Sequence, residues 1–198
     1  MSSPSEDLAA RALAFVVRCH ADHRRESDGE PFIKHSLEVA RLLRDAGCSE
    51  RVVAAGLLHD VVETNVTFAE IAARFGDDVA ALVQGVTGDA RIEGYRLRKQ
   101  LLRDQVRFAG GDVALLFAAD KISSIREWPR HVGRQRARME HLGPDDYVRR
   151  YVERQHAMRL EHYTRSLAML RRIAPEHPLV GQLADELERC TALVGAGM

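Results

Sequence analysis

Four polar side chains interrupt apolar segments of this sequence, and together they could bind a divalent metal ion. His59 and Asp60 are adjacent within the apolar run AAGLLHDVVE, and Asp120 ends the apolar run VALLFAA. His35 opens a predicted helix after a Gly-Glu-Pro turn and could point inward. Burying an unsatisfied imidazole or carboxylate is costly, so each of these groups needs a hydrogen-bond partner or a metal ion.

This combination of two imidazoles and two carboxylates suits Mn, Fe, Zn or Mg, and it leaves positions of an octahedral shell open for water and substrate. A bound ion could activate water and polarise a phosphoryl oxygen. The alternatives are an ordinary buried hydrogen bond between His59 and Asp60 and a helix-terminal cap at Asp120. The His59-Asp60 pair, Asp120 and His35 are three such polar features in one chain, and together they favour the metal site.

Glu63 could transfer protons beside such an ion. It lies four residues after His59 and three after Asp60, so a continuous helix would place all three on one face. A carboxyl group there suits general acid or base catalysis. The alternative is a solvent-exposed contact with an arginine at the helix end.

The elements expected to position these residues are helices, because apolar residues recur at helical spacing and no useful strand pattern appears. Thr67 and Glu70 predict a capping box, and a helix is expected to end before Pro129. The polar segment HVGRQRARMEHLG (131–143) is predicted to be a loop. The predicted helices cover residues 3–20, 35–46, 51–63, 68–75, 77–86, 91–109, 113–127, 144–173 and 178–193.

The 198 residues suit one compact domain, and 45% hydrophobic with 29% charged residues excludes global disorder. We predict one all-α helical bundle over residues 1–198, with a motif-bearing core at about 8–130 and C-terminal helices at about 144–193. The three widely spaced cysteines predict neither a disulfide framework nor a zinc knuckle.

Composition also limits the expected partners. No apolar stretch approaches the roughly 20 residues that span a bilayer, and no signal-peptide pattern is present, so a cytoplasmic protein without a membrane partner is expected. Aromatic residues make up 6% of the chain and do not alternate with arginines, so no nucleic-acid partner is expected. The sequence leaves a homodimer open.

Charge is divided unevenly along the chain. Residues 1–90 contain 15 acidic and 9 basic side chains, whereas residues 91–198 contain 14 acidic and 20 basic ones. Of the 29 basic residues, 26 are arginines, whose planar fork suits phosphate. An arginine-rich half could attract a phosphorylated ligand, although solvated helix faces are the simpler explanation for much of it.

The pattern of His35, His59-Asp60 and Asp120 resembles the HD-domain metal phosphohydrolases. The similarity extends to the hydrolase domain of RelA/SpoT-type enzymes and to the stand-alone small alarmone hydrolases. It covers about half of the chain, through HADHRRESDGEPFIKH (20–35), LLHDVVET (57–64), FAEIAARFGDDVAALVQGVTGD (68–89) and AADKISSIRE (118–127).

This resemblance implies a single-domain, Mn-dependent enzyme that hydrolyses the 3′-diphosphate of the alarmone (p)ppGpp and releases pyrophosphate. Another divalent metal is the alternative to manganese. The resemblance further implies proton transfer by Glu63 and metal ligation by His35, His59, Asp60 and Asp120.

Substrate-binding residues are also implied by the resemblance. Arg24 and Arg25 match a basic pair that contacts the base or a phosphate. Arg159 and Tyr163 match, at i, i+4 spacing, an arginine and a tyrosine that line the nucleotide pocket.

Two positions depart from the family pattern. Thr64 stands where the family usually has an aspartate that helps to set the nucleophile, and Ser124 stands where it usually has an asparagine that meets the substrate. These departures leave two alternatives to (p)ppGpp hydrolysis. One is an HD phosphohydrolase of another nucleotide or of a 3′-phosphorylated cofactor, and the other is a catalytically weak nucleotide-binding module.

Overall fold

The computed structural model describes residues 6–21, 24, 29–143 and 146–195, and within them the chain is helical, apart from turns and one isolated bridge between Arg24 and Pro31. The predicted all-α class is confirmed. The elements are α1 (Glu6–Cys19), α2 (Ile33–Asp45), α3 (Glu50–Leu58), the 3-10 helix η1 (Val61–Thr64), α4 (Phe68–Phe75), α5 (Asp77–Val86), α6 (Tyr95–Ala109), α7 (Gly111–Arg138), α8 (Tyr147–Ile173) and α9 (Pro178–Gly195).

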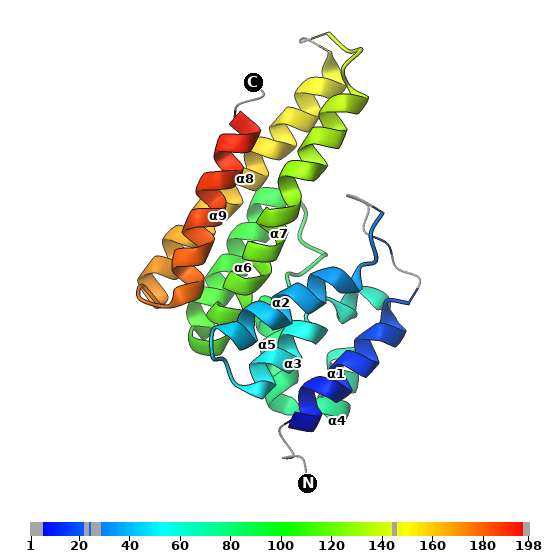
Figure 1. The fold of residues 1–198 in the computed structure, drawn as a ribbon, viewed down its shortest axis with the longest axis vertical. Coiled ribbons are helices and arrows are strands. Elements are labelled where there is room, and N and C mark those ends of the chain that lie inside the picture. Colours follow the sequence, from blue (N-terminus) through cyan, green and yellow to red (C-terminus); the bar gives the residue numbers. More distant parts are fainter. Residues whose placement is uncertain (1–5, 22–23, 25–28, 144–145, 196–198) are drawn as a thin grey trace.

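The helices form two groups that share one long element (Figure 1). Helices α6, α8 and α9 run beside α7 along the long axis of the molecule, and α1 to α5 gather around its N-terminal end. Helix α7 contacts α2, α3 and α5 as well as α8 and α9. It therefore connects the N-terminal helices to the C-terminal ones.

One hydrophobic core runs from α1 to α9. Helix α3 is its centre, because every residue from Val52 to Leu58 is buried. Gly56 lets α2 approach closely, since a Cβ at this position would lie 2.6 Å from Leu43 Cδ1. This close packing brings the start of α2 to the end of α3.

Several predicted helix boundaries are present. Thr67 and Glu70 form the capping box that begins α4. Gly76, at φ +94°, separates α4 from α5. Gly47, at φ +76°, follows the end of α2, where a left-handed residue lets Gly47 and Cys48 N–H bond the carbonyls of Arg44 and Leu43. The predicted helix starts at residues 3 and 144 lie outside the described residues.

The prediction of one helix over 51–63 is wrong. Helix α3 ends at Leu58, and Asp60 precedes the 3-10 helix η1. His59 Nδ1 donates to the Gly56 carbonyl at 2.8 Å, which is the carbonyl that the next helical N–H would bind. His59, Asp60 and Glu63 therefore do not share one α-helical face.

The predicted helix end before Pro129 and the predicted loop at 131–143 are also wrong, since α7 continues through Pro129 to Arg138. Trp128, Val132 and Met139 are buried at 2%, 1% and 8% exposure. Their spacing of four and seven residues forms one helical face, and its burial outweighs the hydrogen bond that proline removes.

Two helix starts differ from the prediction as well. Helix α6 begins at Tyr95 instead of residue 91, because Gly94 has φ +84°. Helix α7 begins at Gly111 instead of residue 113, and Gly110 is its N-cap. None of the described helices combines the length and the apolar character that a membrane span requires.

Candidate metal centre

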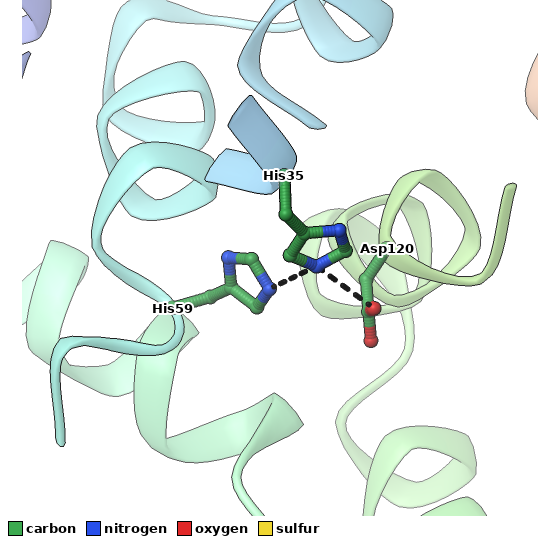
Figure 2. A group of neighbouring side chains, drawn as sticks. All are labelled: His35, His59 and Asp120. Carbon is green, nitrogen blue, oxygen red and sulfur yellow. Dashed lines mark hydrogen bonds and ion pairs between the residues drawn. The ribbon is translucent and has the colours of Figure 1, made fainter. Parts of the chain in front are cut away.

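Side chains from α2, the end of α3 and α7 converge at one buried point, as Figure 2 shows for His35, His59 and Asp120. His35 Nε2 lies 3.2 Å from His59 Nε2 and 3.5 Å from Asp120 Oδ1. Each of these three residues offers one ligand atom, and the three atoms all lie within 4.8 Å of one another. A group with this spacing could hold a metal ion. The structure thus brings together residues that are far apart in the sequence.

Asp60 brings a fourth acceptor to this cluster. Its Oδ2 lies 3.2 Å from His59 Nε2 and 3.6 Å from His35 Nε2. The Asp60 side chain is 24% exposed and the His59 side chain 3%, so the cluster is more open on the Asp60 side. All four predicted ligands are therefore in one place.

Hydrogen bonds on the far side of both imidazoles determine which nitrogen faces the cluster. His59 Nδ1 donates to the Gly56 carbonyl, which can only accept, so His59 Nε2 presents a lone pair when the ring is neutral. His35 Nδ1 lies 2.9 Å from Ser123 Oγ, and the single proton of that hydroxyl goes to Glu38 Oε2. His35 Nδ1 must then donate to Ser123, which leaves His35 Nε2 as an acceptor as well.

Four acceptor atoms this close together repel one another unless a cation, either a proton on an imidazole or a metal ion, lies between them. Burial alone would lower the pKa of His59, but the charges of Asp60 and Asp120 raise it to about 9. The pKa values of Asp60 and Asp120 are lowered despite burial, in part by the neighbouring imidazoles. The donor set fits a divalent metal ion, because nitrogen and oxygen ligands of this kind are those that Mn, Fe and Zn accept.

Sequence reasoning missed Lys121. Its Nζ lies 2.6 Å from Asp120 Oδ2 and 4.8 Å from the Phe117 ring centroid, and the residue is only 7% exposed. It holds one carboxylate oxygen of Asp120 while the other faces His35. The available signal was its identity, since it is one of three lysines in an arginine-rich chain and directly follows Asp120.

Glu63 and Thr64 both lie in η1. Glu63 is exposed, and partial desolvation of its carboxyl together with the charge of Asp60 raises its pKa. The Thr64 hydroxyl donates to the Val61 carbonyl at 2.8 Å, so its proton is used within the chain. The charges of Asp60, His59 and Asp120 all act on the Glu63 carboxyl.

The predicted substrate-binding residues are more scattered. Ser124 Oγ donates to Asp120 Oδ1 at 3.1 Å, so it lies directly beside the metal cluster. Arg24 is exposed and Arg25 lies outside the described residues. On α8, Arg159 is exposed, whereas Tyr163 is 2% exposed and its ring lies 5.6 Å from that of Trp128.

Comparison with known proteins shows the class to which this fold and site belong. The HD domain family matches residues 12–145, which include all four residues of the metal cluster. The chain belongs to the HD domain family, whose hydrolases bind a divalent metal ion.

Individual relatives of this chain carry more specific names than the family does. A probable guanosine-3′,5′-bis(diphosphate) 3′-pyrophosphohydrolase of Synechocystis sp. is 52% identical over 81 residues, which are 40% of this chain and 10% of that relative. Guanosine-3′,5′-bis(diphosphate) 3′-pyrophosphohydrolase MESH1 of Homo sapiens is 37% identical over 123 residues, 60% of this chain and 68% of the relative. This chain therefore spans a tenth of the Synechocystis relative but about two thirds of the human one.

A solved structure extends the similarity to the whole chain. It is that of a metazoan ortholog of SpoT described as hydrolysing ppGpp, with 25% identity, a TM-score of 0.71 and coverage of 98% of both chains. A crystal structure of lmo0812 from Listeria monocytogenes EGD-e has 29% identity and a TM-score of 0.62 over 81% of this chain and 96% of its own.

Proposed function

We propose that this protein hydrolyses guanosine-3′,5′-bis(diphosphate), ppGpp, at the 3′ position and releases pyrophosphate. The observation that supports this most directly is the cluster of four acceptor side chains, in which both imidazoles present Nε2 at 3.2 Å from each other. The human relative that is named for this activity is 37% identical over 60% of the chain, and the HD domain family match covers the cluster. His35, His59, Asp60 and Asp120 would hold the metal ion.

A bound divalent cation supplies Lewis-acid activation of water and of a phosphoryl oxygen. The chain's own residues hold and move the remaining groups. Glu63 would accept a proton from the attacking water and return one to the departing 3′-oxygen, for which a raised pKa is suitable. The bond between phosphorus and the 3′-oxygen breaks, water supplies the new oxygen on pyrophosphate, and the nucleoside 5′-diphosphate leaves.

We further propose manganese as the metal and the whole of 1–198 as one functional domain, supported by the mixed ligand set and by one core from α1 to α9. Arg24, Arg159 and Tyr163 are proposed to bind the substrate, as is Ser124 through its position beside Asp120. Three points stay predictions: substrate binding by Arg25, the formation of a homodimer and the cytoplasmic location.

A second candidate is hydrolysis of another nucleotide or of a 3′-phosphorylated cofactor. It is favoured by Thr64, whose hydroxyl is bonded to a backbone carbonyl and offers no carboxylate to the site. The same observation would also fit a protein that binds a nucleotide but hydrolyses it slowly.

The experiment uses metal-stripped protein reloaded separately with Mn, Fe, Zn or Mg and supplied with ppGpp, pppGpp and a panel of other nucleotides. Ion-exchange chromatography resolves the products. Equal release of GDP and pyrophosphate from ppGpp supports the proposal, and turnover of another compound alone selects the second candidate. Binding without turnover of any compound contradicts both hydrolytic functions.

A further inference from the structure

A cationic cavity of about 260 Å³ lies between α6 and α8, and none of the four predicted metal ligands lines it. Its charged lining consists of four cations and one carboxylate, together with a buried histidine. These residues are Arg96, Lys99, Arg103, Glu161, His162 and Arg165. The excess of positive charge makes an anion the expected occupant.

The one carboxylate in the lining, that of Glu161, pairs with Arg96 and Arg165. Glu161 Oε2 lies 3.0 Å from Arg96 Nε, and Glu161 Oε1 lies 2.8 Å from Arg165 Nη2. In the described part of the chain, neither Lys99 nor Arg103 has a carboxylate within ion-pair distance. Two cations in the lining are therefore left for a ligand.

His162 fixes the guanidinium of Arg103. Arg103 Nη1 donates to His162 Nδ1 at 2.8 Å, so the neutral ring carries its proton on Nε2. His162 is 3% exposed, and among the described residues its Nε2 finds no hydrogen-bond partner. A buried donor without an acceptor costs about 1–3 kcal/mol, which indicates that the cavity lacks an acceptor.

Neighbouring charges also favour the binding of an anion in this cavity. Burial and the charge of Lys121 lower the pKa of Lys99 to about 8. Burial, Lys121 and Lys99 lower the pKa of His162 to about 2, so the imidazole stays neutral and keeps accepting from Arg103. The cations crowd one another, and an anion would relieve this repulsion.

We propose that the α6–α8 cavity is a binding site for a phosphate or pyrophosphate group, with Arg103 and Lys99 as its principal donors. The arginine fork matches two phosphate oxygens, the lysine contributes a compact charge, and the volume accommodates a pyrophosphate ion. The group belongs either to a free anion or to the second diphosphate of a bound nucleotide.

The probe is inorganic pyrophosphate, measured by isothermal titration calorimetry with the full-length protein. The Asp60→Asn background weakens binding of the anion at the metal cluster, so the remaining signal reports the cavity. Arg103→Gln in this background is expected to weaken pyrophosphate binding at least about tenfold, which is a loss of about 1.4 kcal/mol. The matched control is Arg107→Gln on the same helix, where Arg107 pairs with Asp104 at 3.1 Å outside the cavity.

Equal affinities of the Arg103→Gln and Arg107→Gln proteins would overturn the proposal. If Arg103→Gln does not fold, Lys99→Met replaces it, and the unsubstituted protein gives a second readout. Pyrophosphate is then expected to shift the ¹⁵N resonances of the His162 ring, and an unchanged His162 spectrum at saturating pyrophosphate would overturn the proposal.

Steady-state kinetics distinguish the two sources of the group. A rise in KM for ppGpp without a change in kcat in the Arg103→Gln protein assigns the cavity to the nucleotide's second diphosphate. An unchanged KM together with weakened pyrophosphate binding assigns it to a free anion. Pyrophosphate binding requires no turnover, so a failure of the proposed hydrolysis leaves the binding test intact.

Discussion

Ser123 Oγ lies 2.9 Å from His35 Nδ1 and fixes the orientation of that imidazole from the side opposite the metal cluster. Its own proton goes to Glu38 Oε2 at 2.9 Å, and Glu38 Oε1 accepts from Arg126 Nη1 at 2.8 Å. Helix α7 therefore provides both a predicted ligand, Asp120, and the support for a ligand on α2. Such supporting bonds keep the ligating nitrogen free and the ring in place.

Ser123→Ala is expected to weaken metal binding by about 10–100-fold, because His35 loses the partner that sets its tautomer. Chelator competition with the purified protein measures this affinity. Ser36→Ala is the matched control, since Ser36 is equally buried and, among the described residues, its hydroxyl has no partner. Equal metal affinities for the two variants would show that Ser123 does not position His35.

Gly56→Ala is expected to destabilise the fold by about 1–3 kcal/mol through overpacking, because the new Cβ would lie 2.6 Å from Leu43 Cδ1. It should also weaken metal binding, since the Gly56 carbonyl holds His59. Gly181→Ala on α9 is the control and should stabilise the protein by about 0.5–1 kcal/mol, as no atom lies within 4 Å of its Cβ. Urea denaturation gives both values, and a neutral Gly56→Ala would contradict the close α2–α3 packing.

Acid should destabilise the protein partly through His162. Its folded pKa of about 2 lies below the ordinary value of 6.5, so the unfolded chain takes up the proton first and stability falls with pH below about 6.5. Between pH 7 and pH 5 this histidine accounts for about 2 kcal/mol of lost unfolding free energy.

His162→Gln tests this contribution, because a glutamine oxygen can still accept from Arg103. The difference between unfolding free energies at pH 7 and pH 5 should shrink by that amount in the variant. An unchanged difference would mean that His162 is not held neutral in the folded state.

Thr64→Asp is expected to raise the rate of pyrophosphate release from ppGpp by about tenfold or more, because a carboxylate in η1 could help Glu63 to orient and deprotonate water. Asn65→Asp adds the same charge one residue further on and should have little effect. The measurement is the initial rate at saturating metal and substrate. An unchanged rate in the Thr64→Asp protein would show that the threonine does not limit turnover.

The sequence was sufficient to select four candidate ligands that the structure brings together, because His59, Asp60 and Asp120 are polar side chains in apolar segments and His35 opens a predicted helix. Their burial requires a partner whatever the fold. It was not sufficient for the residues that support the cluster. Ser123 meets its partners His35 and Glu38 only when α7 packs on α2. Lys121 pairs with Asp120 on its own helix, and no pattern in the sequence predicts that pair.

The predicted helix boundaries were wrong where tertiary contacts outweighed local sequence signals. Pro129 is a strong local signal for a helix end, but the burial of Trp128 and Val132 keeps α7 continuous. Conversely, the apolar run over 51–63 predicted one helix, and the bond between His59 and the Gly56 carbonyl accompanies its end at the site. This break has no signature in the apolar pattern.

We propose that the cluster of His35, His59, Asp60 and Asp120 holds the metal ion that hydrolysis of ppGpp requires. The most direct test of this proposal is the initial rate of pyrophosphate release from ppGpp by metal-stripped protein as Mn²⁺ is added, for the unsubstituted chain and for Asp60→Ala. The rate should rise from background and saturate in the unsubstituted protein and stay at background in the variant, with both proteins folded by circular dichroism. A rate that is independent of added metal, or that is equal in the two proteins, would contradict metal binding by this cluster as the basis of the activity.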